Sequence, residues 1–557
     1  MNDELFKKVL AILIAVVTVI ATVVAFLQSD AGNRDDHAGR DSTRLAIELV
    51  GRRVNGETRV NYDYSNVYQK YLEMDALTFA AENRGDASTS KRYALLKDSF
   101  LKLSPILQPP YFDASAGTVD YDRYVADVYL TDVTRMKEQY TAAAFVKDGW
   151  DTKANTYIVH LTILAVALFL LGLSATIEIS RPRIIFTVVG IGMAVFASVW
   201  AFSIYTQPVF DLRDHPDAID AFVQGTIATE AQQAEPAIKA FDKAIALVPD
   251  YTAAYVGRST AYEHAGDYEK AIADLKQARA LGNETANVIG EQAWLEYLVG
   301  RFDESIATGR AALEKYPDAP ELWIRFDVAL ALLASGQIEA AQAEYQQGMT
   351  IASQAVADAK SRGEQLSSSL WWSLTAGSDD VAALSSIAQS GEGAPSATTL
   401  QNKEGIIQAA PNLINSLRNM AVSLEYYGRP PGAPITAQIE NLTFAKPVYD
   451  SNNTFLEHDV ADEFEYGVNE MDALFDFSGM KAGQELLVKV YINGEEDASW
   501  RKIVTWEDAG DGSFILPLAI AYSNTFVMVP GNYFIELYVD GQIANEGSFT
   551  VLDAEKT

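Results

Sequence analysis

A spacing of 34 residues recurs through the middle of the chain and restricts what this part can fold into. Gly266 and Gly300 are 34 residues apart, and Gly336 follows after 36. Similar intervals separate a series of small residues: Ala237, Ala271, Ser305 and Ala341. Helix-ending residues recur as well: Pro249, Asn283 and Pro317. Glycine ends helices at turns, and each helical hairpin needs a neighbour to cover its apolar face. The period therefore predicts a stack of helical hairpins.

The residues between these markers carry a family resemblance. Tyr255, Tyr262, the string Gly266-Asp267-Tyr268 and Ala271 together resemble the tetratricopeptide repeat (TPR), which is 34 residues long. The resemblance covers residues 217–350 and implies an α-solenoid of TPR type. In such solenoids the concave face usually binds a peptide or a partner protein.

Projection of this chain onto the repeat pattern predicts which side chains line that face. They are Val256, Thr260, Glu263, Trp294 and Tyr297. A Trp or Tyr at these positions can instead serve helix packing, so both interpretations stand. The Lys/Asn pattern with which some such repeats hold a C-terminal carboxylate is absent. The acidic face favours a basic or apolar ligand, and we expect a protein partner there.

Three apolar runs, at residues 9–27, 157–177 and 184–204, are each about long enough to cross ~30 Å of hydrocarbon as a helix. They predict an N-terminal transmembrane anchor (1–28) and a transmembrane helical hairpin (156–204). Segment 29–155 follows one crossing, and the chain after residue 204 follows three. Both numbers are odd, so both segments are expected on the same side of the membrane. His160, near the start of the second run, could relay protons, but we expect an interfacial histidine.

Basic residues predict the orientation. Arg181 and Arg183 lie in the short turn between the second and third runs, and Lys7 and Lys8 precede the first. Such residues favour the cytoplasmic side. The protein is thus expected to be a multi-pass cell-membrane protein with extracytoplasmic soluble domains. In an alternative interpretation residues 1–31 are a cleaved signal peptide, which gives the same placement.

Segment 29–155 is predicted to be a membrane-proximal helical bundle. Its helices are expected at 45–54, 64–81, 90–103 and from 121 towards 150. The strings 103–105, 110–113 and 153–157 resemble those of uncharacterised bacterial membrane proteins with one span, a helical insert and a paired-span hairpin. That resemblance covers about residues 1–204 and implies no known activity.

The C-terminal third changes character. Residues 351–428 lose the 34-residue period but keep apolar helical faces, which predicts an irregular helical cap, and 428–434 is rich in Pro and Gly, as in a linker. From 435 to 553 apolar residues alternate, and Asn493-Gly494 and Asp540-Gly541 are typical hairpin turns. The pattern predicts an all-β sandwich of immunoglobulin-like type, and its last hairpin resembles those of bacterial surface modules.

Composition excludes several function classes. The net charge of −32 repels phosphates, so no nucleic-acid partner is expected, and the absence of cysteine excludes thiolate chemistry and Cys-based metal sites. No catalytic constellation, phosphate loop or zinc motif stands out, so we expect a non-enzymatic protein without cofactor or metal. Asp508 and Asp511 could bind Ca²⁺, although acidic turns are commonplace. Trp500, Trp506 and Tyr522 could form a sugar platform or simply pack in a core.

Three functions remain open from the sequence. The first is an anchored scaffold or adaptor that holds a partner protein through the repeats. The second is an envelope structural protein that assembles as a homo-oligomer. The third is a surface receptor that binds glycans through the C-terminal domain.

Overall fold

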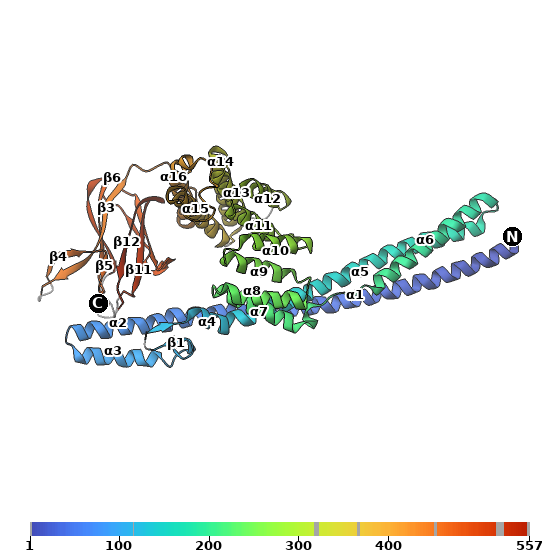
Figure 1. Cartoon of the computed structure of the whole chain (residues 1–557), viewed down its shortest axis with the longest axis horizontal. Coiled ribbons are helices and arrows are strands. Elements are labelled where there is room, and N and C mark those ends of the chain that lie inside the picture. Colours follow the sequence, from blue (N-terminus) through green and yellow to red (C-terminus); the bar gives the residue numbers. More distant parts are fainter. Residues whose placement is uncertain are drawn as a thin grey trace. The chain divides into compact units, whose positions relative to one another are not determined.

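A computed structural model describes residues 3–114, 116–316, 322–364, 368–450, 454–519 and 528–553. Pro317 and Tyr522, both used above, lie outside the described residues. The chain forms two compact units, one of residues 1–60 and 125–251 and the other of residues 61–124 and 252–557. Most elements are helical, with β-sheets confined largely to the C-terminal part (Figure 1).

Three helices of the first unit, α1 (Asp3–Tyr62), α5 (Thr131–Thr176) and α6 (Ser180–Thr206), share one apolar core. The buried residues of α1 recur every seven positions, at Leu10, Val17, Val24, Ala31, Ala38 and Leu45. Buried α5 residues alternate by three and four: Tyr157, His160, Leu164, Ala167, Leu171 and Ser174. These intervals are those of coiled-coil seams.

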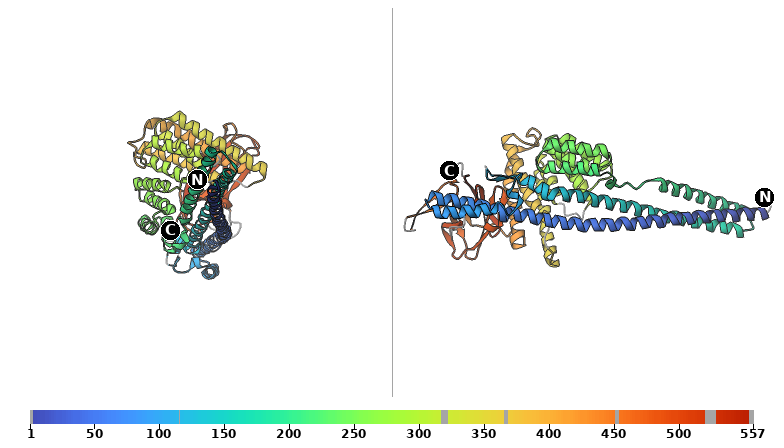
Figure 2. Two further views of the ribbon diagram at one scale, coloured as in Figure 1. Left: turned by 90° about the vertical axis from the view of Figure 1, so that its right-hand side faces the viewer. Right: turned by 90° about the horizontal axis from the view of Figure 1, so that it is seen from below.

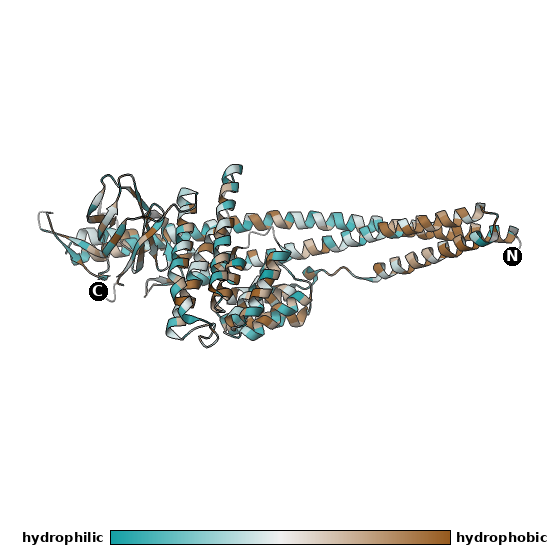
Figure 3. Cartoon of the chain, turned by 90° about the horizontal axis from the view of Figure 1, so that it is seen from above, coloured by the Kyte–Doolittle hydropathy of each residue, from teal (hydrophilic) through white to brown (hydrophobic). Residues whose placement is uncertain are grey.

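By length and composition, the described residues contain three helices able to cross a membrane. Their apolar parts lie side by side (Figure 3). Apolar side chains also cover the outer surface of these segments, including Val19, Phe26, Phe169 and Val188. His160 is fully buried between the helices, and its ring centroid lies 4.3 Å from that of Trp200. This burial follows from the seam position of residue 160.

The helix that begins with the first apolar run does not stop where the run ends. α1 is continuous through residues 45–54, which were expected to form a separate helix. Beyond the apolar core it runs beside α5 (Figure 2), where Arg52 pairs with Asp132 at 3.1 Å. The unit is completed by α7 (Pro216–Glu230) and α8 (Ala234–Leu247), a hairpin in which Phe241 fills the space beside Gly225. Two short helical turns belong here too: η3 (Ala126–Leu130) and η4 (Leu212–Asp214).

The second unit includes a small helical region. It consists of η1 (Asp63–Tyr68), α2 (Gln69–Asn83), α3 (Ala87–Phe100), η2 (Pro105–Leu107), β1 (Phe112–Asp113), β2 (Thr118–Val119) and the start of α4 (Tyr121–Val125). Asp86 caps α3, because its side chain accepts a hydrogen bond from the Thr89 backbone N–H at 3.1 Å.

A series of helical pairs follows in the second unit. The bounds are α9 (Thr252–His264), α10 (Tyr268–Ala280), α11 (Ala286–Leu298), α12 (Phe302–Lys315), α13 (Leu322–Ala334) and α14 (Ile338–Arg362). The expected cap contains α15 (Ser368–Ser390), α16 (Lys403–Val422) and the π-helical turn η5 (Ser423–Tyr427). Gly266, Gly300 and Gly336 all have positive φ at the turns, as the repeat spacing predicts. The region 252–350 is thus a TPR-like helical repeat.

The C-terminal part is a β-sheet domain. Its strands are β3 (Gln438–Tyr449), β4 (Phe455–Val460), β5 (Glu463–Phe464), β6 (Met471–Met480), β7 (Glu485–Ile492), β8 (Glu495–Glu496), β9 (Lys502–Thr505), β10 (Gly510–Ala519), β11 (Gly531–Val539) and β12 (Gln542–Val551). One sheet has the order β10-β6-β3-β4. The other has the order β5-β12-β11-β7-β8, with β9 also paired to β7. Residues of both sheets share one apolar core. Both predicted tight turns form, with positive φ at Asn493-Gly494 and Asp540-Gly541.

Candidate functional site

The structure brings the predicted partner-binding residues onto two neighbouring first helices of the repeat pairs. Val256, Thr260 and Glu263 lie on α9, and Trp294 and Tyr297 lie on α11. Thr260 is exposed, whereas Val256, Glu263 and Trp294 are half-buried. Tyr297 is only 3% exposed and belongs to the apolar core of the later repeats, so its ring serves packing.

A hydrogen bond links the two helices at this surface. The indole Nε1 of Trp294 donates to Oε1 of Glu263 at 2.8 Å. The Trp294 ring also stacks on Tyr297, with centroids 5.3 Å apart and planes 27° from parallel. Glu263 and Trp294 are therefore held in fixed orientations, with Thr260 beside them on the accessible side of α9.

Three carboxylates that the sequence analysis did not single out lie on the next helices. Glu291 is on α11, Asp327 on α13 and Asp380 on α15. Glu291 and Asp327 occupy equivalent repeat positions, because the 36 residues between them match the interval between Gly300 and Gly336. That recurrence was a usable sequence signal. Asp380 lies outside the repeat period, so only the fold shows that it belongs with them.

The surroundings of these carboxylates disfavour ionisation. Burial raises the pKa of Asp327 well above its usual range, and the charges of Asp380 and Glu291 add to the effect. Burial, with the neighbouring charge of Asp379, raises the pKa of Asp380 to about 6. Glu291 keeps contact with water, yet the protein around it and the charge of Glu263 raise its pKa to about 7. A side chain that is solvent-accessible but surrounded by protein is typical of a concave surface.

Cations on the first helices of the repeats are already engaged. Arg258 makes two hydrogen bonds to Asp274, at 2.8 and 2.7 Å, and Arg325 pairs with Glu344 at 2.7 Å. Among the residues that the structure describes, none forms an ion pair or hydrogen bond with the side chain of Glu291, Asp327 or Asp380. The three carboxylates thus form an uncompensated acidic series, which we name the acidic ladder. Unpaired buried carboxylates are costly, so the ladder is unfavourable in the protein by itself.

A buried hydroxyl group lies in the electric field of the ladder. Tyr345, on α14, is 0% exposed, and its Oη has no hydrogen-bond partner. Burial raises the pKa of this phenol, and the charges of Asp380 and Asp327 raise it further. Buried hydroxyl groups are nearly always hydrogen-bonded, so this orphaned donor is unusual.

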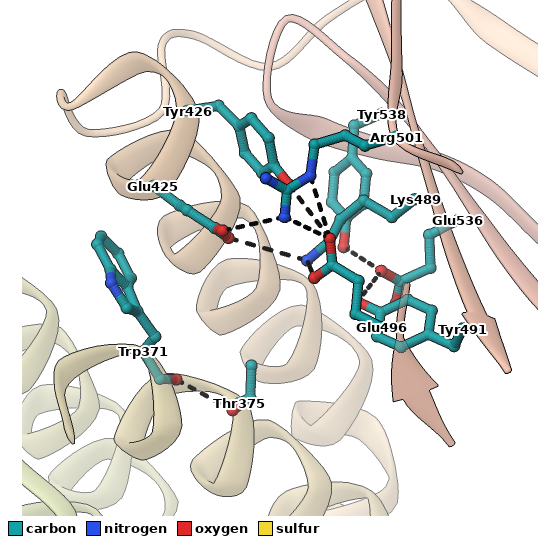
Figure 4. Close-up of polar contacts among 10 residues, drawn as sticks. All are labelled: Trp371, Thr375, Glu425, Tyr426, Lys489, Tyr491, Glu496, Arg501, Glu536 and Tyr538. Carbon is teal, nitrogen blue, oxygen red and sulfur yellow. Dashed lines mark hydrogen bonds and ion pairs between the residues drawn. The ribbon is translucent and has the colours of Figure 1, made fainter. Parts of the chain in front are cut away.

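A second polar cluster, shown in Figure 4, joins the helical cap to the β-sheet domain. Lys489 of β7 is 6% exposed, and its Nζ lies 2.8 Å from Glu496 and 3.9 Å from Glu425. Arg501 pairs with the same two carboxylates at 2.6 and 3.4 Å and lies over the ring of Tyr426. Burial alone would raise the pKa of Glu496, but hydrogen bonds from Lys489 and Arg501 lower it.

Charge balance distinguishes this junction from the ladder. Tyr491 and Tyr538 donate to the remaining buried carboxylate, Glu536, at 2.9 and 3.0 Å. Every charged side chain drawn in Figure 4 pairs with a group of opposite charge or accepts a hydrogen bond from a phenol. The cluster thus has the properties of a structural junction rather than of a ligand site.

Two of the aromatic residues considered for sugar binding, Trp500 and Trp506, lie within the described residues, and both pack in or against the core of the β-sheet domain. Trp506 is 7% exposed and packs edge-on against Phe477 in the core of the β-sheet domain. Trp500 is half-buried and lines a cavity of about 780 Å³ together with Tyr64, Tyr68 and Tyr533. Asp511 accepts a hydrogen bond from the Gly479 backbone at 2.8 Å, and among the described residues no three His, Asp or Glu side chains gather to hold a metal ion.

Comparison with known proteins gives no family. No family model matches the sequence, and no curated protein matches it. Among solved structures, one match is YrrB, a TPR protein with an unusual peptide-binding site. It has 16% identity and a TM-score of 0.23, over 30% of this chain and 89% of that chain. Another is the alkylpurine DNA glycosylase AlkC of Pseudomonas fluorescens bound to DNA containing an abasic site analog. It has 12% identity and a TM-score of 0.21, over 76% of this chain and 99% of that chain. Both scores are too low to carry an argument about this protein.

Proposed function

We propose that the protein is a membrane-anchored scaffold that holds a partner protein against the first helices of its TPR-type repeats. In this proposal α1, α5 and α6 cross the membrane, and the repeats and the immunoglobulin-like C-terminal domain stand outside the cytoplasm. The observation that carries the proposal is the surface of α9 and α11, where the fixed Glu263–Trp294 pair adjoins the uncompensated acidic ladder.

The other features of the chain agree with a binding role. The large charged cluster at the cap is internally neutralised, and the cation partners near the ladder are used elsewhere. A surface that keeps unpaired carboxylates beside an oriented indole is expected where a second molecule completes the contacts.

Site-specific photo-crosslinking in intact cells tests this function. A photoreactive amino acid replaces Thr260, which is exposed on α9, and in a control chain it replaces Lys276, which is exposed on α10 of the same hairpin. We expect position 260 to capture one defined protein and position 276 to capture none. Adducts only between copies of this chain would instead support envelope assembly, and the absence of any adduct at position 260 would contradict the scaffold function.

A further inference from the structure

The acidic ladder indicates the chemistry of the partner, an inference that rests on the proposed scaffold function. Glu291, Asp327 and Asp380 come from three different helices, and no cationic side chain of the described residues pairs with them. A ligand that brings positive charge would convert three unfavourable carboxylates into charge-assisted hydrogen bonds, which are about twice as strong as neutral ones.

A single metal ion does not fit this arrangement. No group of three potential ligands gathers closely enough among the described residues, so the negative charge is distributed along the stack. Packed helices lie about 8–10 Å apart, and an extended peptide in the polyproline II conformation advances about 3.1 Å per residue and returns to the same side every third residue. Cationic side chains about three residues apart would therefore match carboxylates on successive first helices.

The hydroxyl group of Tyr345 is an independent sign that this face is incomplete. It is fully buried, it lacks an acceptor, and it lies in the field of Asp327 and Asp380. A buried hydroxyl group without an acceptor beside these carboxylates favours a ligand that carries polar groups of its own, which can reach the hydroxyl through a bound water. A peptide backbone offers such groups in its carbonyls, whereas a simple polyamine has no acceptor of this kind.

We propose that the first-helix surface of α11, α13 and α15 binds an extended, lysine- or arginine-bearing segment of the partner protein. Its cationic groups pair with the accessible carboxylates of Glu291 and Asp380, and their charge also compensates the buried Asp327. Trp294 marks the end of the site towards α9, where its half-buried indole gives a cation or an apolar side chain a flat contact.

Fluorescence binding to the full-length protein in detergent tests this inference. The probe is a labelled peptide with lysine at every third position among alanines, and the control peptide carries glutamate in place of lysine. We expect the lysine peptide alone to bind. The double variant Glu291→Gln, Asp380→Asn should weaken that binding by about tenfold or more, since each substitution replaces a charge-assisted hydrogen bond with a weaker neutral one.

Glu314→Gln is the matched control, because Glu314 is exposed on α12 and forms no ion pair or hydrogen bond through its side chain with any described residue. This control should leave binding unchanged. The single variant Glu291→Gln changes only an exposed position, so weaker binding by it cannot be attributed to loss of folding. Equal weakening by Glu314→Gln would reduce the effect to net charge and overturn the proposal. So would full binding by the double variant, or displacement of the peptide by spermidine at similar concentration. A partner captured at position 260 without peptide binding would refute this inference alone.

Discussion

At the scale of single residues, the feature that distinguishes this chain is a buried carboxyl group without a counter-charge. Asp327 is 8% exposed, and the groups that face it are acidic or phenolic: Glu291, Asp380, Tyr297 and Tyr345. Its pKa is raised in the folded state. The carboxyl group therefore destabilises the fold increasingly as the pH rises from 3.8, the value of the unfolded chain, towards the folded pKa.

Asp327→Asn is expected to raise the thermal unfolding midpoint at neutral pH and to flatten its dependence on pH. The amide keeps the shape of the side chain but cannot ionise, and each unit of raised pKa corresponds to about 1.4 kcal/mol. Thermal unfolding of the detergent-solubilised protein, measured at acidic and at neutral pH, tests this expectation. Asp303→Asn, at an exposed position of α12, is the control. A lower midpoint for Asp327→Asn at neutral pH would show that the carboxylate has a stabilising partner.

At the scale of elements, the junction between the helical cap and the β-sheet domain buries strand residues that the alternating pattern places on the solvent side. Alternation in β7 predicts that Leu487 and Lys489 face solvent, because Leu486, Val488 and Val490 face the core. Both are nevertheless buried, since the second face of the sheet packs against η5 and α16. The turn Asp540-Gly541 lies at this junction, where the Ser423 hydroxyl donates to the Gly541 carbonyl at 3.2 Å.

A comparison of two glycines in equivalent hairpin turns distinguishes the stability that comes from the turn itself from the stability that comes from the junction. Gly494 and Gly541 have φ of 89° and 80°, so alanine costs each about 1–2 kcal/mol. A Cβ at Gly494 meets nothing within 4 Å, whereas one at Gly541 would lie 2.5 Å from the Ser423 hydroxyl oxygen. We expect Gly541→Ala to destabilise the protein more than Gly494→Ala in chemical denaturation, and only Gly541→Ala to speed proteolysis of the 428–434 linker. Equal effects would mean that the turn alone matters.

At the scale of the whole molecule, the number of membrane crossings decides which regions share a compartment. The three long apolar helices of the described residues are compatible with three crossings. One crossing would then precede residues 29–155, and three crossings would precede residues 205–557. Because both numbers are odd, both segments would lie on the same side of the membrane. The turn between α5 and α6 would lie on the other side.

The absence of cysteine makes this arrangement directly measurable. Single substitutions Ser88→Cys, Ser548→Cys and Glu178→Cys place thiols at exposed positions of the helical insert, the β-sheet domain and the turn. A membrane-impermeant thiol reagent added to spheroplasts should label the first two, and should label the third only after the membrane is opened. Opposite labelling of positions 88 and 548 would contradict the odd number of crossings.

Sequence alone determined the features that depend on local periodicity. The recurrence of Gly266, Gly300 and Gly336 marked the helix turns, Asn493-Gly494 and Asp540-Gly541 marked the hairpins, and the apolar runs marked the long helices. These patterns succeed because turn geometry and helix faces depend on residues close together in the chain. The prediction of partner-binding residues depended only partly on such local patterns. The repeat pattern indicated Glu263 and Trp294, and the fold links these two side chains by a hydrogen bond.

Tertiary packing decided the rest. Tyr297 fits the repeat face but is drawn into the core, Lys489 is buried by a helix from the cap, and Asp380 joins Asp327 from outside the repeat period. The burial and the charge environment of these groups come from helices distant in sequence, which no local pattern specifies. The continuity of α1 through residues 45–54 belongs here as well, because α5 supports it along its length.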